Sequence, residues 1–326
     1  MIDTHYDLLS IAYTSYLKND FSYLEKISKY FHEKNVKGVI ANLYFMSEEE
    51  MKKEEHPDYY KKEVSVLDMF IISKTILDHY LPEIDILYSI EGADYIKGVD
   101  ELEKLYEAGL DALMIVWNNK NRYGSGNRSD EGLTADGVQL IQKAISLGMG
   151  IDLSHANKNT FNDIITVIKI NQDNNKDVCC YASHSNSRTL CSRDRNLDDE
   201  QLRKLAGVNG LVGVVSTRNF VVEPEMKDTA TDEEKKAKYL EHIDYITSII
   251  GEDKIMLATD DMDFCKDADP EYGEVVIYNY ETIGSVLAEQ LFSKYGEETT
   301  YKMMYGNAKE KVFNKIRSRR KERGVK

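Results

Sequence analysis

The sequence contains little cysteine and no hydrophobic run long enough for a membrane helix. Its four cysteines, Cys179, Cys180, Cys191 and Cys265, have neither C-x-x-C spacing nor the pattern of a disulfide framework. Reduced thiols of this kind predict a cytoplasmic protein. No apolar stretch approaches the roughly 20 residues that a membrane span requires, and a candidate strand begins at Met1, which leaves no room for a signal peptide. We therefore expect no membrane span.

Basic charge is also scarce. The 326 residues include 57 acidic and 42 basic side chains, which gives a formal net charge of −15. Non-specific nucleic-acid binding depends on a basic surface that neutralises phosphates, so we expect no nucleic-acid partner. Residues 315–323 at the C-terminus are basic rather than hydrophobic. We expect this segment to be a frayed, solvated helix end.

Proline is equally rare, with four residues, and no low-complexity segment is present. The sequence therefore offers no obvious linker, and we expect one domain over residues 1–326. Short apolar runs alternate with longer amphipathic segments, which is typical of parallel strands joined by crossover helices. The expected strands are residues 1–5, 36–44, 84–90, 111–117, 150–154, 178–183, 210–215 and 255–259.

Apolar residues at helical spacing fill the intervals between these strands. The expected helices are residues 21–31, 66–76, 102–108, 133–147, 160–170, 198–205 and 232–250, with two or three more at the C-terminus. Eight strand-then-helix units predict an α/β protein with a (β/α)₈ TIM barrel and extra C-terminal helices. A doubly wound open sheet is the alternative, but no Gly-rich phosphate loop follows the first strand.

Side chains that can bind a metal stand where the expected strands end, which is where a (β/α)₈ barrel carries its functional groups. These candidates are His5, Asp7, Glu91, His155 and His184. Residues at i and i+2 of a strand share a face, so His5 and Asp7 are expected to point the same way. The other four histidines fall in expected helices or loops. Imidazole and carboxylate together are typical ligands of a divalent metal.

The number of these ligands favours two metal ions. Five ligands exceed what one tetrahedral zinc needs while it keeps an open position. Two ions that share a bridging carboxylate and a bridging water use all five, and Glu91 is the natural bridge because it ends an apolar strand. Taken alone, Glu91 would be read as a solvent-facing loop acid. Two cations lower the pKa of the shared water, and Asp260 is expected to accept its proton, with Asp261 and Asp263 as rivals.

Several motifs occur in a fixed order along the chain. They are His5-Tyr-Asp7, Glu91-Gly92, Gly148-Met-Gly-Ile-Asp-Leu-Ser-His155, Ala182-Ser-His184-Ser185, Arg195-Asn196, Leu257-Ala-Thr-Asp260 and Gly306-Asn307. This ordered set resembles the membrane (renal) dipeptidase family of binuclear zinc hydrolases, which belong to the amidohydrolase-like barrels. The resemblance extends over nearly the whole chain.

The resemblance implies hydrolysis of dipeptides by a metal-bridging hydroxide. His5, Asp7 and Glu91 would hold one Zn²⁺, and Glu91, His155 and His184 the other, with Co²⁺ or Mn²⁺ as possible substitutes. Arg195 would bind the free C-terminal carboxylate of the substrate. Without the resemblance, Arg195 would be assigned to a surface ion pair with neighbouring acids such as Asp194, Asp198 or Asp199. The family tolerates a D-residue at the C-terminal position, and homodimers are common among its members.

One departure from the family concerns the end of the fourth strand. Relatives similar to the renal enzyme carry a histidine there that is thought to polarise the scissile carbonyl, and the corresponding residue here is Trp117. We expect Trp117 or Asn118 to contact the substrate. The departure leaves two alternatives open: a related hydrolase of a non-peptide amide, N-acyl amino acid or lactone, and a metal-retaining binding protein with weak or no turnover.

Overall fold

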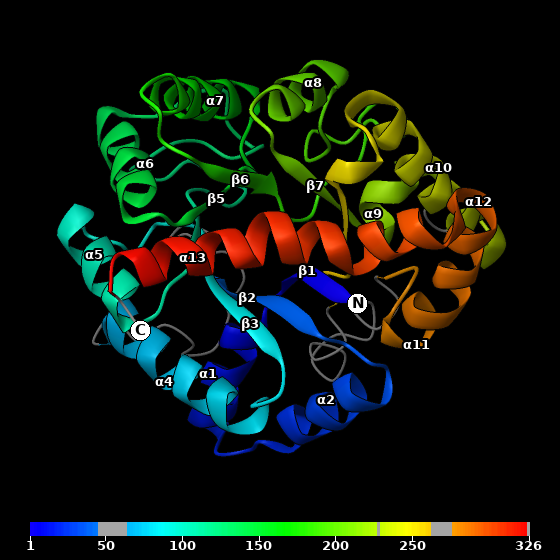
Figure 1. Ribbon diagram of the computed structural model, residues 1–326, viewed down its shortest axis with the longest axis horizontal. Coiled ribbons are helices and arrows are strands. Elements are labelled where there is room, and N and C mark those ends of the chain that lie inside the picture. The colour runs from blue at the N-terminus through cyan, green and yellow to red at the C-terminus, as the bar shows by residue number, and fades with distance from the viewer. Residues whose placement is uncertain (45–63, 227–228, 262–275, 325–326) are drawn as a thin grey trace.

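Eight parallel strands stand side by side in chain order and enclose the centre of the molecule (Figure 1). The computed structural model describes residues 1–44, 64–226, 229–261 and 276–324. The strands are β1 (Ile2–Tyr6), β2 (Gly38–Tyr44), β3 (Asp85–Glu91), β4 (Ala112–Met114), β5 (Gly150–Asp152), β6 (Cys179–Ala182), β7 (Leu211–Val215) and β8 (Ile255–Ala258). The backbone N–H of Asp260 donates to the carbonyl of His5 (3.2 Å), so the first and last strands lie together and the barrel is nearly closed. The predicted (β/α)₈ barrel is confirmed.

Helices cover the outside of this barrel (Figure 1). They are α1 (Leu8–Lys18), α2 (Ser22–Glu33), α4 (Val66–Tyr80), α5 (Val99–Ala108), α6 (Ala135–Leu147), α7 (Lys158–Asp173), α8 (Asp199–Gly207), α9 (Arg218–Val221), α10 (Asp232–Ile250), α11 (Tyr280–Thr282), α12 (Ala288–Tyr301) and α13 (Asn314–Glu322). Gly109 and Gly148 end α5 and α6 in the left-handed conformation, with φ of 119° and 81°, which glycine adopts without a steric penalty.

The sequence analysis missed one of these elements and misplaced the end of another. Helix α1 was not predicted, because all residues from Leu8 to Tyr13 are buried and the helix has only a weak amphipathic pattern. The fourth strand was expected to reach Trp117, but β4 ends at Met114. Beyond that point the carbonyl of Ile115 accepts from the N–H of Ala93 instead of continuing a ladder with β5.

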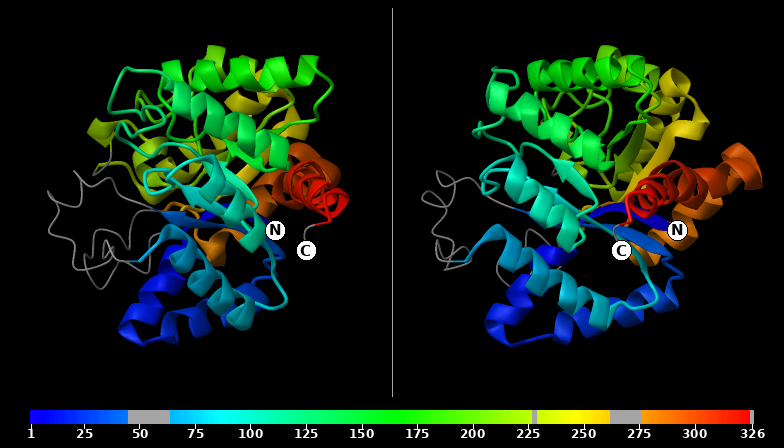
Figure 2. Two further views of the ribbon diagram at one scale, coloured as in Figure 1. Left: turned by 90° about the vertical axis from the view of Figure 1, so that its left-hand side faces the viewer. Right: turned by 60° about the vertical axis from the view of Figure 1, so that its left-hand side comes forward.

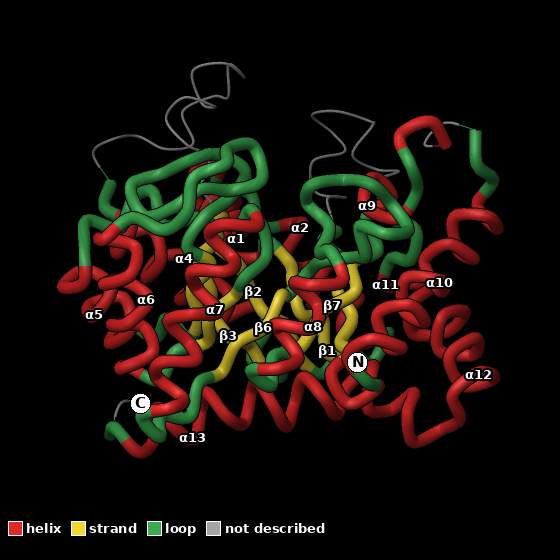
Figure 3. The backbone as a smooth tube through the Cα atoms, turned by 90° about the horizontal axis from the view of Figure 1, so that it is seen from above, coloured by secondary structure: helices red, strands yellow, loops and turns green. Residues whose placement is uncertain are grey.

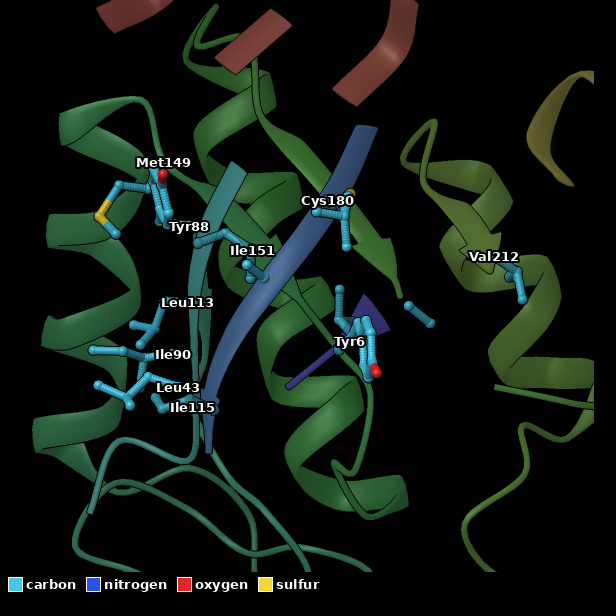
Figure 4. Close-up of a cluster of buried hydrophobic side chains, with 14 of the residues drawn as sticks. Tyr6, Leu43, Tyr88, Ile90, Leu113, Ile115, Met149, Ile151, Cys180 and Val212 are labelled. Atoms are coloured by element: carbon cyan, nitrogen blue, oxygen red, sulfur yellow. The ribbon is translucent and has the colours of Figure 1, made fainter. Parts of the chain in front are cut away.

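The apolar core has two parts because successive strand residues face opposite sides of the barrel wall. The larger part lies between the strands and the outer helices, and Figure 4 shows Leu43, Ile90, Leu113 and Ile115 gathered there. The smaller part fills the barrel interior at the end where the strands begin. Its strand residues are Ile2, Ile40, Leu87, Ala112, Cys179, Tyr181, Leu211 and Met256.

The C-terminal helices close the end of the barrel where the strands begin. Val312, Phe313 and Ile316 pack on the interior residues, and α13 runs beneath the strands while the loops that follow the strands lie on the opposite side (Figures 2 and 3). The prediction of a frayed, solvated C-terminal end was therefore wrong for Ile316 and Arg320, which are buried, although Arg317, Ser318 and residues 321–324 are exposed. Four of its basic side chains pair with acidic residues near the strand starts: Lys315, Arg317, Arg319 and Arg320.

No helix within the described ranges is both long enough and apolar enough to cross a membrane.

Candidate metal centre

The five predicted metal ligands lie together at the end of the barrel where the strands terminate. His5 stands in β1, Glu91 is the last residue of β3, and His155 and His184 follow β5 and β6. The strand geometry used to pair His5 with Asp7 does not extend to Asp7, which follows β1 directly and is the N-cap residue of α1. The pairing of β1 with β2 shifts register between Asp3 and Tyr6, an irregularity of the kind that redirects a side chain. All five side chains are buried or nearly so.

Glu91 lies between two sets of these ligands. One of its oxygens, Oε2, is 3.0 Å from His5 Nε2. The other, Oε1, is 2.9 Å from His155 Nε2 and 3.7 Å from His184 Nε2. The side chain is 3% exposed, so the alternative of a solvent-facing loop acid was wrong. Each oxygen of one carboxylate thus faces a different set of imidazoles, which is the arrangement that a bridging ligand requires.

The two histidines of the second set face each other with their Nε2 atoms 3.0 Å apart. Asn118 Oδ1 lies 3.0 Å from His155 Nδ1, and because an amide oxygen only accepts, that nitrogen carries the proton. A neutral His155 therefore presents an unprotonated Nε2 to the Glu91 carboxylate. His155 also has a φ of 63°, a conformation that side chains other than glycine rarely adopt and that is frequent at functional sites.

These facing acceptors fit a cation site. Asp7 Oδ1 is buried and has no hydrogen-bond partner among the residues that the structure describes, and it lies 3.8 Å from His5 Nε2. Ligand atoms within 4.8 Å of one another form three sets: His5–Asp7–Glu91 and Glu91–His155–His184, which share Glu91, and His5–His184–Asp260, which brings Asp260 to the same centre. Imidazole and carboxylate without thiolate suit Zn²⁺, Co²⁺ or Mn²⁺. The residues present therefore fit a pair of divalent cations.

The histidines of the site have pKa values shifted in opposite directions. Burial lowers the pKa of His5, but the carboxylates of Glu91, Asp260 and Asp7 outweigh it and raise the pKa to about 10. Burial and the nearby Arg195 lower the pKa of His155 to about 3. Burial raises the pKa of Glu91 less than His5 and His155 lower it, so the net shift is downward. The site thus holds Glu91 ionised and His155 neutral, as metal ligands must be, whereas His5 is protonated without metal and would release its proton when a cation binds.

Asp260 points toward the same centre from the end of β8. Its Oδ1 is 3.8 Å from His5 Nε2, and its Oδ2 accepts a hydrogen bond from Thr217 Oγ1 (3.0 Å). Asp260 has a φ of 51°, another strained position. Burial, with Glu91 nearby, raises its pKa to about 6. Its rival Asp261 lies near Tyr6 and Tyr280, and its charge helps to raise the pKa of both hydroxyls. The other rival, Asp263, lies outside the described residues.

Arg195 is buried beside the histidines and makes no surface ion pair of the kind that its neighbours suggested. Its Nη1 donates to Ser185 Oγ (3.0 Å) and its Nη2 to the carbonyl of His184 (2.7 Å). Nε has no partner within the described part of the chain. The neighbouring acids pair elsewhere: Asp194 with Arg188, Asp198 with Lys158, and Asp199 with Arg203. Arg195 is thus a buried cation beside the candidate centre.

Trp117 forms a wall next to this centre. Its ring lies edge-on to Tyr44 with the centroids 4.9 Å apart, and 6.0 Å from the ring of His155. Asn118 hydrogen-bonds to His155 through its Oδ1, and its contact with a substrate stays a prediction. The backbone of the loop that follows approaches so closely that a Cβ on Gly126 would overlap the carbonyl oxygen of Trp117.

Other polar residues around the histidines were not identified from the sequence. Asn42 Nδ2 lies 3.0 Å from His5 Nδ1, and Ser183 Oγ lies 2.8 Å from His184 Nδ1. Asn42 is the one polar side chain inside the apolar strand β2, which was a usable signal. Ser183 and Thr217 carry no comparable signal, because serine and threonine are common wherever a strand ends.

Comparison with known proteins identifies the family and the fold of this chain. A sequence model of the membrane dipeptidase family (peptidase family M19) matches residues 66–322, a range that excludes His5 and Asp7. A curated but uncharacterised protein encoded in the pqqA 5′ region of Klebsiella pneumoniae is 34% identical over 180 residues, which are 52% of this chain and 62% of that protein. The chain matches 41–62% of the length of this protein and three further curated relatives.

Solved structures share the fold. A metallopeptidase from Rhodobacter sphaeroides, crystallised with a phosphinate mimic of the dipeptide L-Ala-D-Ala, is 18% identical with a TM-score of 0.72, and the match covers 97% of this chain and 98% of that one. The dipeptidase AC, described as a metallopeptidase of family M19, is 19% identical, also with a TM-score of 0.72, over 97% of both chains.

Proposed function

Because this chain belongs to the membrane dipeptidase family, we propose that it hydrolyses the peptide bond of dipeptides at a pair of bound metal ions. His5, Asp7 and Glu91 would hold the first cation, and Glu91, His155 and His184 the second. Zn²⁺ is the proposed metal, with Co²⁺ or Mn²⁺ as substitutes. The observation that carries this proposal is that the two oxygens of the buried Glu91 face two different sets of ligands.

When bound, such cations would supply a water molecule of lowered pKa near neutral pH and would polarise the scissile carbonyl. Asp260 would accept the proton of that water. Its Oδ1 faces the proposed centre, where a carboxylate can accept a proton from a bound water and release it again. Thr217 holds one oxygen of this carboxylate and leaves the other turned toward His5.

Arg195 would bind the carboxylate of the substrate. A buried cation without a partner anion is costly, and a substrate carboxylate would supply that partner inside the site. The guanidinium is already fixed by Ser185 and by the carbonyl of His184, so little further ordering would be needed. Recognition of a free C-terminal carboxylate would place the scissile bond at the C-terminal end of the substrate.

Trp117 and Asn118 would act differently from each other. Trp117 would bound the substrate pocket, with one N–H donor to offer and no titrating proton. Asn118 would keep the proton of His155 on Nδ1, and so leave Nε2 available to a metal. The related Rhodobacter enzyme was crystallised with a mimic of L-Ala-D-Ala, which supports dipeptides with a D-residue at the C-terminal position as substrates here.

A panel of L-L and L-D dipeptides, assayed after metal removal and reconstitution with Zn²⁺, Co²⁺ or Mn²⁺, tests the proposal. We expect no turnover without metal and restored turnover with it. N-acyl amino acids, lactones and cyclic amides belong on the same panel. Hydrolysis of these alone would redirect the proposal to a related hydrolase, and bound metal without any turnover would indicate a binding protein.

Replacing Arg195 tests the substrate assignment. Arg195→Ala should raise KM for dipeptides by about 10²-fold, because a charge-assisted contact of roughly 3 kcal/mol is lost. Hydrolysis of the corresponding dipeptide amides, which lack the carboxylate, should change little. Arg203→Ala is a matched control, since that arginine is exposed on α8 and pairs with Asp199 outside the site. Equal losses on peptide acids and amides would contradict carboxylate recognition.

A cytoplasmic location, a homodimeric state and one hydrolase domain over residues 1–326 remain parts of the proposal. Three unpaired, buried thiols, Cys179, Cys180 and Cys191, support a reducing environment. Cell fractionation and light scattering would test the location and the assembly.

A further inference from the structure

Two buried carboxylates below the candidate ligands have no place in the chemistry described so far. Asp3 and Asp152 are 0% and 1% exposed. Neither belongs to a set of candidate metal ligands within the described residues. Each stands in a strand, one at the first and one at the fifth, and precedes a candidate histidine by two or three positions.

Asp152 joins the ends of β5 and β6. Its Oδ1 accepts hydrogen bonds from the backbone N–H groups of Ser154 and Ser183, both at 3.0 Å. The regular pairing of the two strands reaches Asp152 opposite Tyr181. Beyond it, this carboxylate replaces the carbonyl acceptors of a ladder. The two residues that it holds directly precede His155 and His184.

Asp3 joins β1 and β8 in the same way. Its Oδ1 accepts from the N–H groups of His5 (3.1 Å) and Thr259 (3.0 Å). Its Oδ2 accepts from the hydroxyls of Thr259 and Tyr280. One of the held residues is the ligand His5 itself, and the other directly precedes Asp260. Both carboxylates therefore accept from the residue two positions ahead and from the neighbouring strand end.

We propose that Asp3 and Asp152 are positioning residues that tie the strand ends carrying the metal ligands and Asp260 to one another. This inference rests on the proposed metal-dependent function. A buried N–H without an acceptor is strongly disfavoured, so each carboxylate fixes two backbone segments at once. Loss of Asp152 frees the segments of both histidines of the second set, and loss of Asp3 frees His5 of the first set together with Asp260.

Short side-chain contacts extend this effect to the imidazoles. Ser154 Oγ accepts from the backbone N–H of His184 (3.2 Å), and Ser183 Oγ lies 2.8 Å from His184 Nδ1. Two short routes therefore run from Asp152 to His184, one through Ser154 to its backbone N–H and one through Ser183 to its imidazole. Each route passes through one short serine side chain, so a shift of either serine is transmitted to His184.

Metal binding to the purified full-length chain tests the proposal without an activity assay. Zn²⁺ affinity is measured by competition with a chromophoric chelator for the parent, Asp152→Ala and Asp152→Asn. We expect Asp152→Ala to weaken binding of one of two ions by about 10–100-fold, as is typical when a group supporting a ligand is removed. Asp152→Asn keeps Oδ1 as an acceptor, and Oδ2 has no partner among the described residues, so we expect affinity within about threefold of the parent.

Double variants show which of the two metal sites loses Zn²⁺ affinity. Asp152→Ala should add little in a His184→Ala background, where the second site is already lost, and should keep its effect in an Asp7→Ala background. Asp3→Ala should behave in the opposite way. Asp111→Asn is the matched control, because Asp111 is also a buried acid that accepts a backbone N–H but lies at the other end of the barrel. It should lower stability and leave Zn²⁺ affinity unchanged.

Unaltered Zn²⁺ affinity in a folded Asp152→Ala variant would overturn the positioning role alone. Absence of Zn²⁺ binding by the parent would overturn the proposed metal centre and this inference with it. If Asp152→Ala does not fold, Ser154→Ala decides: a severalfold weaker affinity at an unchanged melting temperature supports the proposal, and an unchanged affinity rejects it.

Discussion

The two ends of the barrel differ in whether their charged and polar side chains are paired. At the end where the strands terminate, acceptors face one another: Glu91 meets the unprotonated Nε2 of His155, and Asp7 Oδ1 has no partner within the described ranges. At the end where the strands begin, acids meet basic residues of the C-terminal helices. These pairs are Asp85 with Lys309 and Arg317, Asp111 with Arg320, Asp177 with Lys315 and Arg319, and Asp253 with Lys311.

This difference separates a functional end from a stabilising end. Unbalanced acceptors weaken a fold unless a ligand compensates them, and such conflicts are expected at functional sites. At the other end, paired charges surround the apolar residues Val312, Phe313 and Ile316. These contacts stabilise the fold, and each charge already has a partner within the protein. Conservative changes at the two ends should therefore alter different properties.

The largest effect is expected at Glu91. Glu91→Gln keeps the shape of the side chain but removes the charge that both ligand sets share, so kcat/KM should fall by about 10³-fold, the upper range for one electrostatic group. Zn²⁺ should raise the melting temperature of the parent and not that of the variant, because only a folded state that binds metal is stabilised by it. Steady-state kinetics and thermal melts with and without Zn²⁺ check this. A variant that keeps its activity would remove Glu91 from the centre.

At the opposite end, Arg320→Ala should reduce stability and spare catalysis. Arg320 donates to Asp111 (3.2 Å) and to the carbonyl of Leu110 (3.0 Å), so its loss leaves a buried carboxylate without its cation. The expected loss is about 3–5 kcal/mol in the free energy of unfolding. Urea denaturation measures it, and kcat/KM of the folded variant should stay within about twofold of the parent. A catalytic defect at unchanged stability would break the separation between the two ends.

The sequence predicted the functional end better than the stabilising one. Histidines and acids that directly follow short apolar runs are visible in a single sequence, and barrel topology then brings them together. His5, Glu91, His155, His184 and Asp260 do converge. The contacts that hold them were not visible, because the partner of Asn118 is a histidine 37 residues away and an amide can serve many roles.

The stabilising end was misjudged because its partners are distant and ordinary. Residues 315–323 resemble a solvated tail, since the acids that pair with them, Asp85, Asp111 and Asp177, lie far away in the sequence. Only Ile316 and Arg320, four residues apart, mark the buried face of α13. Helix α1 was missed for a related reason: it is buried around most of its circumference and so has only a weak amphipathic pattern.

Acid should weaken the functional end through His242. This buried ring accepts from the N–H of Ser187, in the segment that leads to Arg195, and contacts the carbonyl of Val221. Burial lowers its pKa to about 4, below the value of about 6.5 in an unfolded chain. The unfolded chain therefore takes up a proton first as the pH falls below about 6.5, and stability is lost until about pH 4.

His242→Gln keeps a donor and an acceptor but does not titrate. Between pH 7 and pH 5 the metal-free parent should lose about 2 kcal/mol more unfolding free energy than this variant. Urea denaturation at both pH values measures the difference, and the other buried histidines cancel because both proteins contain them. Equal losses in the two proteins would show that acid acts elsewhere in the molecule.

The smallest effect is expected for Arg317→Ala, one turn before Arg320 on α13. Arg317 also pairs with an acid near a strand start, but its side chain is 49% exposed and its partner Asp85 keeps a second cation in Lys309. Exposed pairs contribute about 0–1 kcal/mol, so unfolding should change by no more than that. Raising the salt concentration should shrink even this difference, because exposed charges are screened. Two arginines on one helix, each matched to an aspartate, would then differ severalfold in effect because only one is buried. Similar losses at both positions would mean that the number of ion pairs, rather than their burial, stabilises this end.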